Sequence, residues 1–151
     1  MNIAASNSAR FRAARERAGL SIAETATRTG ISEPCVWDLE THDHELMSVY
    51  SPADLQRFAG VFQVAPRELV GTEERDAPIS ADDLASAIRE QCRVRSMTLD
   101  EFGDAAGWDV SKALDAPQVL LTEISIDGIV DVCRELGLDW QRFISGLSAE
   151  A

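Results

Sequence analysis

The side chains best suited to catalysis or metal binding lie close together between residues 35 and 45. Cys35, His42, Asp43, His44 and Glu45 are all of types that ligate transition metals, and Cys35 with His44 could form a nucleophile and its base. However, the spacing fits no closed tetrahedral site, and no third group is present to orient the histidine. We therefore expect a polar loop here, with no metal, no cofactor and no enzymatic activity.

The segment that precedes and overlaps this stretch is suited to a different chemistry, the recognition of base edges. Ser21 and Glu24 form a capping box that begins a helix, and Gly30 ends that helix. Ser32 caps a further helix that has Pro34 in its first turn. Helix, tight glycine turn and helix is the layout of a helix-turn-helix, whose second helix usually lies in the major groove. We call residues 32–41 the reading helix.

The reading helix contains no Lys or Arg. Val36 and Leu39 mark its inward face, because they lie three residues apart. The positions expected to point outward are Ser32, Glu33, Trp37, Asp38 and Thr41. An outward Trp37 is suited to a protein contact or a dimer interface, and the alternative is partial burial under residues 45–50.

The net charge of −12 is distributed unevenly along the chain. Residues 1–71 hold seven arginines against nine carboxylates, whereas residues 72–151 hold seven Lys and Arg against seventeen carboxylates. Residues 1–31 alone carry a net charge of +3. Because DNA is a polyanion, we expect any contact with it to be confined to the N-terminal part.

Four arginines in this part are candidate phosphate contacts, and three residues of the reading helix are expected nearest the bases. They are Arg10, Arg12, Arg17 and Arg28 for the phosphates, and Ser32, Glu33 and Trp37 for the bases. So few cations predict a weak monomer site and a shallow salt dependence, which favours a homodimer that reads two half-sites.

The bulk composition excludes several classes of protein. A chain of 151 residues with 45% hydrophobic content is typical of one compact domain or two very small ones. No apolar run approaches the ~18 residues of a membrane span, and the first residues lack the basic and apolar regions of a secretory signal. The three widely spaced cysteines are typical of reduced thiols, so we expect a cytoplasmic protein.

A repeated pattern divides the chain into two units. Residues that match at an offset of 77 are Phe11-Arg12 with Ile88-Arg89, Leu20-Ser21 with Met97-Thr98, Glu24 with Glu101, and Gly30 with Gly107. At an offset of 74, Leu55, Phe58, Phe62, Val64 and Leu69 match Ile129, Val132, Leu136, Leu138 and Phe143. We interpret this as a first unit at 1–71, a linker at 72–80 and a degenerate, acidic copy at 81–151. The alternative is that two unrelated helical units share spacing by chance.

The apolar spacing predicts an all-α fold with five helices in each unit. The expected ranges are 8–18, 21–29, 32–41, 52–63 and 66–70, then 81–94, 98–106, 109–115, 126–137 and 139–146. Residues 119–124 are apolar enough to form a short extended connection. We expect Trp108 and Trp140 to lie in the core.

Residues 8–71 resemble the Cro and lambda-repressor family of helix-turn-helix proteins, the XRE class. The resemblance rests on Phe11-Arg12, Arg15-Glu16, Gly19-Leu20-Ser21, Ala26, Gly30-Ile31-Ser32, Glu40, Leu55, Phe58-Ala59, Phe62, Val64 and Leu69. A degenerate copy of the same pattern covers residues 81–146. The resemblance implies a five-helix unit that binds DNA, and an internal ion pair between Arg15 and Glu40. The chain departs from the family at Ile22 and His42, where a polar amide and a small glycine are usual.

The departures leave two functions open. The leading one is a transcriptional regulator that binds double-stranded DNA through its N-terminal unit. The alternative is an antitoxin, immunity or anti-repressor protein that uses the acidic fold to bind and neutralise a basic protein partner. The candidate partner-binding residues are Trp37, Asp38, Asp109 and Asp115.

Overall fold

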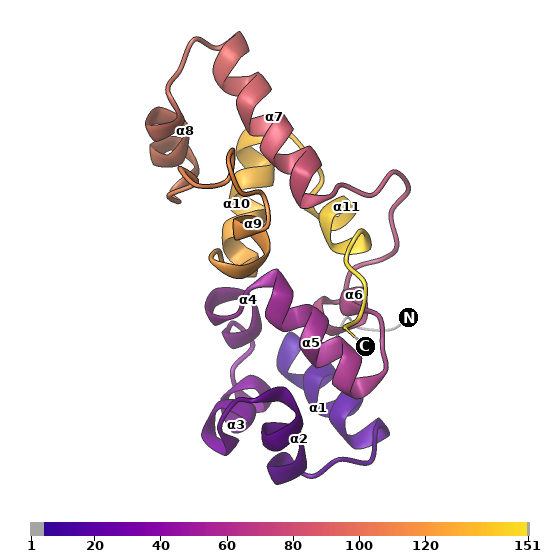
Figure 1. Cartoon of the computed structure of the whole chain (residues 1–151). Coiled ribbons are helices and arrows are strands. Elements are labelled where there is room, and N and C mark those ends of the chain that lie inside the picture. The colour runs from indigo at the N-terminus through magenta and orange to yellow at the C-terminus, as the bar shows by residue number, and fades with distance from the viewer. Residues whose placement is uncertain (1–4, 151) are drawn as a thin grey trace.

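The computed structural model describes residues 5–150, and within that range it contains eleven helices and no strand (Figure 1). The helices are α1 (Asn7–Arg17), α2 (Ile22–Thr29), α3 (Glu33–Thr41), α4 (Glu45–Val49), α5 (Pro52–Phe62), α6 (Pro66–Val70), α7 (Ala81–Val94), α8 (Leu99–Ala106), α9 (Val119–Thr122), α10 (Ile126–Leu136) and α11 (Trp140–Ser145). The all-α prediction is confirmed. None of these helices is both long and apolar enough to cross a lipid bilayer.

Short polar side chains determine where most of these helices begin. Seven helices follow a Ser or Thr whose hydroxyl accepts the backbone N–H three residues further on, which satisfies one of the unpaired donors of the first turn. These residues are Ser6, Ser21, Ser32, Ser51, Ser80, Thr98 and Ser125. Helices α2 and α8 both end at a left-handed glycine, Gly30 with φ 78° and Gly107 with φ 84°. A residue with a Cβ would be strained at either position.

The molecule is elongated, with α1–α6 at one end and α7–α11 at the other (Figure 1). We call these sets the N-terminal group and the C-terminal group. In the first, α1 packs on α3 and α6, and α2 packs on α3 and α5. In the second, α7 packs on α8 and α10. Between the groups, α4 packs on α10, α5 on α9, and α6 on α11.

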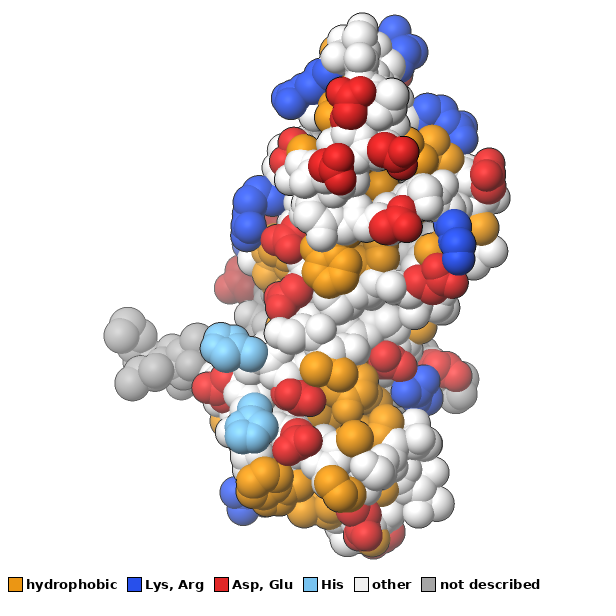
Figure 2. Space-filling model, turned by 90° about the vertical axis from the view of Figure 1, so that its left-hand side faces the viewer, with side chains coloured by type: hydrophobic (Ala, Val, Ile, Leu, Met, Phe, Trp, Pro, Cys, Tyr) orange, Lys and Arg blue, Asp and Glu red, His pale blue; other side chains and the backbone are white. Residues whose placement is uncertain are grey.

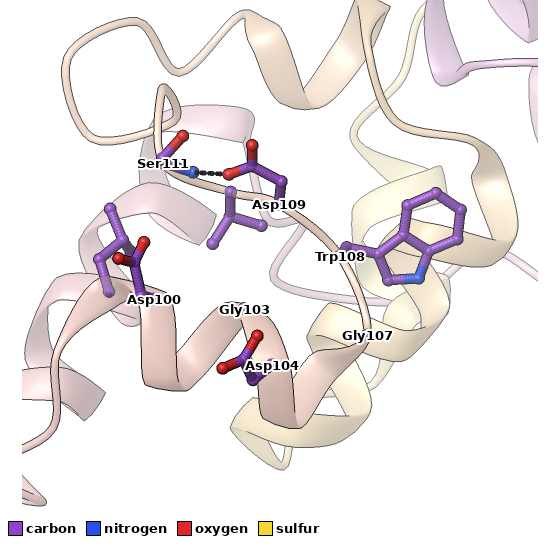
Figure 3. A pocket seen from close by; sticks show the side chains of 9 residues that line it. Asp100, Gly103, Asp104, Gly107, Trp108, Asp109 and Ser111 are labelled. Carbon is purple, nitrogen blue, oxygen red and sulfur yellow. Dashed lines mark hydrogen bonds between the residues drawn. The ribbon is translucent and has the colours of Figure 1, made fainter.

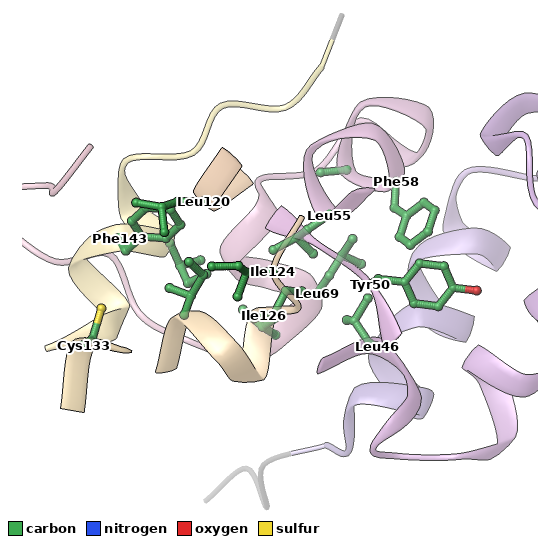
Figure 4. Close-up of a cluster of buried hydrophobic side chains, with 14 of the residues drawn as sticks. Leu46, Tyr50, Leu55, Phe58, Leu69, Leu120, Ile124, Ile126, Cys133 and Phe143 are labelled. Atoms are coloured by element: carbon green, nitrogen blue, oxygen red, sulfur yellow. The ribbon is translucent and has the colours of Figure 1, made fainter. Parts of the chain in front are cut away.

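One apolar cluster runs through both groups. Figure 4 shows where they meet, with Leu46 and Leu55 of the N-terminal group close to Ile124 and Ile126 of the C-terminal group. All four side chains are almost fully buried. Since burying one such side chain contributes roughly 1.5–3 kcal/mol, the shared cluster holds the two groups together.

Hydrogen bonds also join the two groups. The Ile126 N–H donates to the Tyr50 carbonyl oxygen at 2.9 Å, and the Ser48 hydroxyl donates to an Asp127 carboxylate oxygen at 3.0 Å. The C-terminal tail returns to α5, where a Cβ on Gly60 would lie only 1.7 Å from the Glu150 carbonyl oxygen. Glycine at position 60 therefore lets the tail lie directly on α5.

The segment predicted as a linker, residues 72–80, is irregular from residue 72 to 79 and is bound to α11. Ile79 is buried, and its N–H donates to the Arg142 carbonyl oxygen at 3.1 Å. The Arg142 guanidinium in turn donates to the Ala77 carbonyl oxygen at 2.8 Å. These bonds fix the segment on the C-terminal group.

The predicted helix at 109–115 is wrong, because residues 111–115 form turns. The Asp109 carboxylate accepts the N–H of Ser111, only two residues further on, at 2.9 Å. This local bond stabilises a turn in place of a first helical turn.

Two further expectations about the connections are corrected. The expected loop at 45–50 contains α4, and the expected extended segment at 119–124 contains α9. In each short helix one leucine is buried, Leu46 in α4 and Leu120 in α9, and this side chain anchors the helix on the core. As a result the N-terminal group has six helices among the described residues, where five were expected.

Trp108 and Trp140 are half-buried, whereas both were expected in the core. The indole N–H of Trp108 donates to an Asp131 carboxylate oxygen at 2.9 Å. A polar N–H at one end of a large apolar ring explains why Trp108 lies at the edge of the core.

Candidate nucleic-acid interface

The second helix of the helix-turn-helix, α3, presents one face to the core and the other to solvent. Val36 and Leu39 are buried, as their spacing predicts. The exposed side chains on the opposite face are Ser32, Glu33, Trp37 and Thr41, and Asp38 is half-buried. The serine hydroxyl that begins α3 accepts the Cys35 N–H at 3.3 Å.

A buried ion pair ties the end of α3 to α1. The Arg15 guanidinium donates through Nε and Nη2 to the two carboxylate oxygens of Glu40, at 2.8 Å each, and these side chains are only 12% and 6% exposed. Its Nη1 donates to the Leu20 carbonyl oxygen, also at 2.8 Å. The hydrogen bonds with Glu40 raise the pKa of Arg15. One side chain thus joins α1, the α1–α2 turn and α3 in a fixed geometry.

The segment that follows α3 is held by Asp43, which sequence reasoning had placed in a polar loop without a role. The Ser8 hydroxyl, in the first turn of α1, donates to the Asp43 carboxylate. Hydrogen bonds from Ser8 and Ser6 lower the pKa of Asp43. A carboxylate is also favoured here by the N-terminus of α1. No local spacing signals this contact, because 35 residues separate Ser8 and Asp43.

Trp37 lies on the solvent side of α3, with 54% of its surface exposed. Its ring meets the edge of the His42 ring, with the centroids 5.9 Å apart and the planes at 88°. The interpretation that placed Trp37 under residues 45–50 is therefore wrong. Figure 2 shows the face of the molecule that carries α3, where apolar and acidic side chains lie around the two histidines.

The four candidate arginines do not gather around α3. Arg17 and Arg28 line a hollow of about 400 Å³ with Phe62 and Glu68, beside the end of α5. Arg10 donates to the Asn7 side chain at 2.7 Å.

The remaining candidate, Arg12, forms an exposed pair with Glu16 at 3.0 Å. The guanidinium of Arg10 lies against Gly71, at the end of α6. Arg10 and Arg17 share one face of α1 because they are seven residues apart, and that face is turned toward α5 and α6.

The C-terminal group has an acidic hollow where the turn after α8 lies. The hollow of about 600 Å³ lies between α8 and residues 107–111, and Asp100, Asp104 and Asp109 line it (Figure 3). The hydrogen bond from Ser111 lowers the pKa of Asp109. Asp109 and the exposed Asp115 follow α8 in the C-terminal group, whereas Trp37 and Asp38 lie on α3 in the N-terminal group, so the candidate partner-binding residues are divided between the two groups.

The stretch considered for a metal does not assemble into a site. Among the described residues 5–150, no group of three His, Cys, Asp or Glu side chains is arranged to hold a metal ion. The Asp43 carboxylate accepts a hydrogen bond from the Ser8 hydroxyl, and Nε2 of His42 lies 3.8 Å from a carboxylate oxygen of Asp38. The Cys35 side chain lies near the buried Tyr50 and contributes to the raised pKa of that phenol, after the larger effect of burial.

Comparison with known proteins agrees with this geometry. Residues 8–70 match the family model described as a helix-turn-helix domain. No curated protein matches the chain. The matched range runs from the second residue of α1 to the end of α6, and it includes the glycine turn and the Arg15–Glu40 pair. Residues 8–70 are therefore similar to a helix-turn-helix domain, which agrees with the arrangement of α2, the glycine turn and α3.

Proposed function

We propose that the protein is an XRE-class transcriptional regulator that binds double-stranded DNA through the exposed face of α3. The observation that carries this proposal is the bidentate Arg15–Glu40 pair, which fixes α3 as a rigid, solvent-facing second helix. Base recognition requires side chains held in place before binding, and this anchor supplies that order.

The exposed residues of α3 are suited to a limited set of base contacts. The Glu33 carboxylate accepts hydrogen bonds, and its match in the major groove is the amine of cytosine. The apolar ring of Trp37 is suited to the methyl group of thymine. Ser32 and Thr41 can donate or accept.

Contacts to the phosphates depend on backbone groups more than on arginines. Arg17 and Arg28 lie beside α5, and Arg12 is paired with Glu16. At the starts of α2 and α3, the Glu24 and Cys35 N–H groups are bonded to the capping serines and Pro34 has no N–H. The N–H groups that remain as phosphate donors are those of Ile22, Ala23 and Glu33. Because few cations contribute, affinity is modest and its salt dependence is shallow.

A selection from fragmented genomic DNA of the host tests this proposal. The full-length protein is expected to enrich discrete loci at low salt, and Trp37→Ala is expected to lose them. Val94→Ala is the matched control, because Val94 is 64% exposed but lies on α7, in the other group. Uniform recovery of all fragments by the wild-type protein, or full retention of the loci by Trp37→Ala, rejects the proposal.

The second candidate function is neutralisation of a basic protein partner, as by an antitoxin, immunity or anti-repressor protein. The observation that favours it is the large exposed area of Trp37 beside Asp38, on a helix without cations. An exposed aromatic surrounded by carboxylates is typical of an anchor for a basic surface. In a pull-down from the host, this function predicts a stoichiometric basic protein that Trp37→Ala fails to recover, with no enriched DNA.

A further inference from the structure

Backbone features of the N-terminal group recur in the C-terminal group. Helices α2 and α8 each span eight residues, and their left-handed caps Gly30 and Gly107 are 77 residues apart. Helices α5 and α10 each span eleven residues, and both end at a left-handed residue, Gln63 with φ 57° and Gly137 with φ 70°. A left-handed glutamine is uncommon, so its match with Gly137 is informative.

The two short helices that sequence analysis did not predict belong to the same pattern. Helix α4 contains the buried Leu46 and precedes the buried Tyr50, and α9 contains Leu120 and precedes Ile124 at an offset of 74. Helices α6 and α11 follow α5 and α10 after connections of the same length. Helices α4, α5 and α6 thus have counterparts in α9, α10 and α11.

The contacts between the groups are reciprocal under this correspondence. Helix α4 packs on α10, which is the counterpart of α5, and α5 packs on α9, which is the counterpart of α4. Helix α6 packs on its own counterpart, α11. Reciprocity of this kind defines a two-fold interface between equal subunits.

We propose that residues 1–71 and 81–151 are two copies of one unit, and that the second copy occupies the face through which the first would pair with another molecule. Each molecule then carries a single reading helix, α3. The DNA target, which rests on the proposed function, is then a single non-palindromic half-site for each chain.

The interface favours pairing of the two units within one chain, which we call the internal pair, over pairing of the first units of two separate chains. In the internal pair, the Tyr50 carbonyl oxygen accepts the Ile126 N–H at 2.9 Å. The residue of the first unit that corresponds to Ile126 is Pro52, which has no N–H. Two first units would therefore leave both Tyr50 carbonyls without this donor, and a buried acceptor without a donor disfavours such a pair.

The second copy has no equivalent of the reading helix, and the residues that correspond to Arg15 and Glu40 explain why. Residues 77 positions after Arg15 and Glu40 are Cys92 and Pro117, so the pair that anchors α3 has no equivalent. Helix α8 lies on the same side of the molecule as α3 (Figure 1), and the exposed surface there is rich in carboxylates (Figure 2). The acidic hollow beside α8 would repel a second stretch of phosphates.

Two measurements on the full-length protein without DNA test the internal pairing. Sedimentation equilibrium is expected to give the monomer mass of 16.5 kDa over a wide concentration range. In the same sample, the Ile126 amide is expected to exchange slowly, because its acceptor lies in the other group. The Leu99 amide is the control, since it also begins a helix but has no acceptor within residues 5–150, and should exchange quickly. A dimer mass, or fast exchange at Ile126, overturns the pairing.

A selection from a pool of duplexes with randomised centres tests the single site. The expected result is a motif without an inverted repeat, bound by one chain per duplex. An inverted repeat with half-sites about 10 bp apart, bound by two chains, overturns it. If no duplex is enriched, the DNA proposal and the single-site target both fail, while the mass and the Ile126 amide still decide the internal pairing.

Discussion

Arg15 and Glu40 meet through two parallel hydrogen bonds of 2.8 Å, in a position that solvent barely reaches. The same guanidinium also binds the Leu20 carbonyl oxygen, so three elements of the helix-turn-helix depend on one side chain. The orientation of α3 relative to α1 and α2 follows from this arrangement.

Removal of either partner should destabilise the protein strongly. Arg15→Ala or Glu40→Ala leaves a poorly solvated charge without its counterion, which should lower the free energy of unfolding by about 3 kcal/mol. Denaturant melts measure this loss. Glu90→Ala is the control, because its pair with Arg93 is exposed and should contribute little. A loss below half a kcal/mol for Glu40→Ala, on the scale expected of exposed pairs, rejects a structural role for the buried pair.

Gly30→Ala and Gly107→Ala should cost similar amounts of stability. Both glycines adopt a left-handed conformation, and a Cβ added at either would meet no atom within 4 Å. The penalty is therefore that of the backbone alone, about 1 kcal/mol in each case. Thermal or denaturant unfolding measures it, and Asn in place of Ala should recover part of the loss. A neutral effect at Gly107 would show that the turn after α8 tolerates another conformation.

Asp43 should contribute to the loss of stability in acid. Its pKa is lowered in the folded state by hydrogen bonds from Ser8 and Ser6. The stabilisation is therefore present above the ordinary carboxyl pKa of 3.8 and is lost as the pH falls through the lowered value. Unfolding free energies across this range should fall less steeply for Asp43→Asn than for the wild type. Asp76→Asn, at an exposed position, should leave the slope unchanged, and an unchanged slope in Asp43→Asn would contradict the role assigned to the Ser8 contact.

Much of the fold could be predicted from local sequence signals. Ser21, Gly30 and Ser32 determine the ends of α2 and the start of α3 through short-range bonds, and the structure has these ends where they were predicted. The helix expected at 109–115 failed because Asp109 favours a turn. This signal was in the sequence, but apolar spacing outweighed it in the prediction.

The arrangement of the site was harder to predict. Helical spacing predicted which side of α3 is exposed, because that depends only on Val36 and Leu39. It could not predict that Arg17 and Arg28 lie beside α5, because that depends on how α1 and α2 pack. The same holds for the contact between Ser8 and Asp43, which joins distant parts of the chain.

Reducing the negative charge of α3 should strengthen binding to DNA of any sequence. The double change Glu33→Gln with Asp38→Lys removes two carboxylates and adds a cation on the solvent side, which should raise non-specific affinity about tenfold at low salt. Gel-shift titration against a random-sequence duplex measures it. Glu74→Gln with Asp76→Lys is the matched control, because it makes the same change in net charge in the exposed segment before α7. Equal gains in both variants would mean that α3 does not face the DNA.

The most direct test of the central claim monitors the three tryptophan indole N–H signals by NMR while a random-sequence duplex is added at low salt. Trp37 is exposed on α3, whereas Trp108 is bonded to Asp131 and Trp140 is half-buried on α11. If α3 binds DNA, the Trp37 signal should shift and the other two should stay in place. An unmoved Trp37 signal at saturating duplex, or shifts confined to Trp108 and Trp140, would contradict DNA binding through α3.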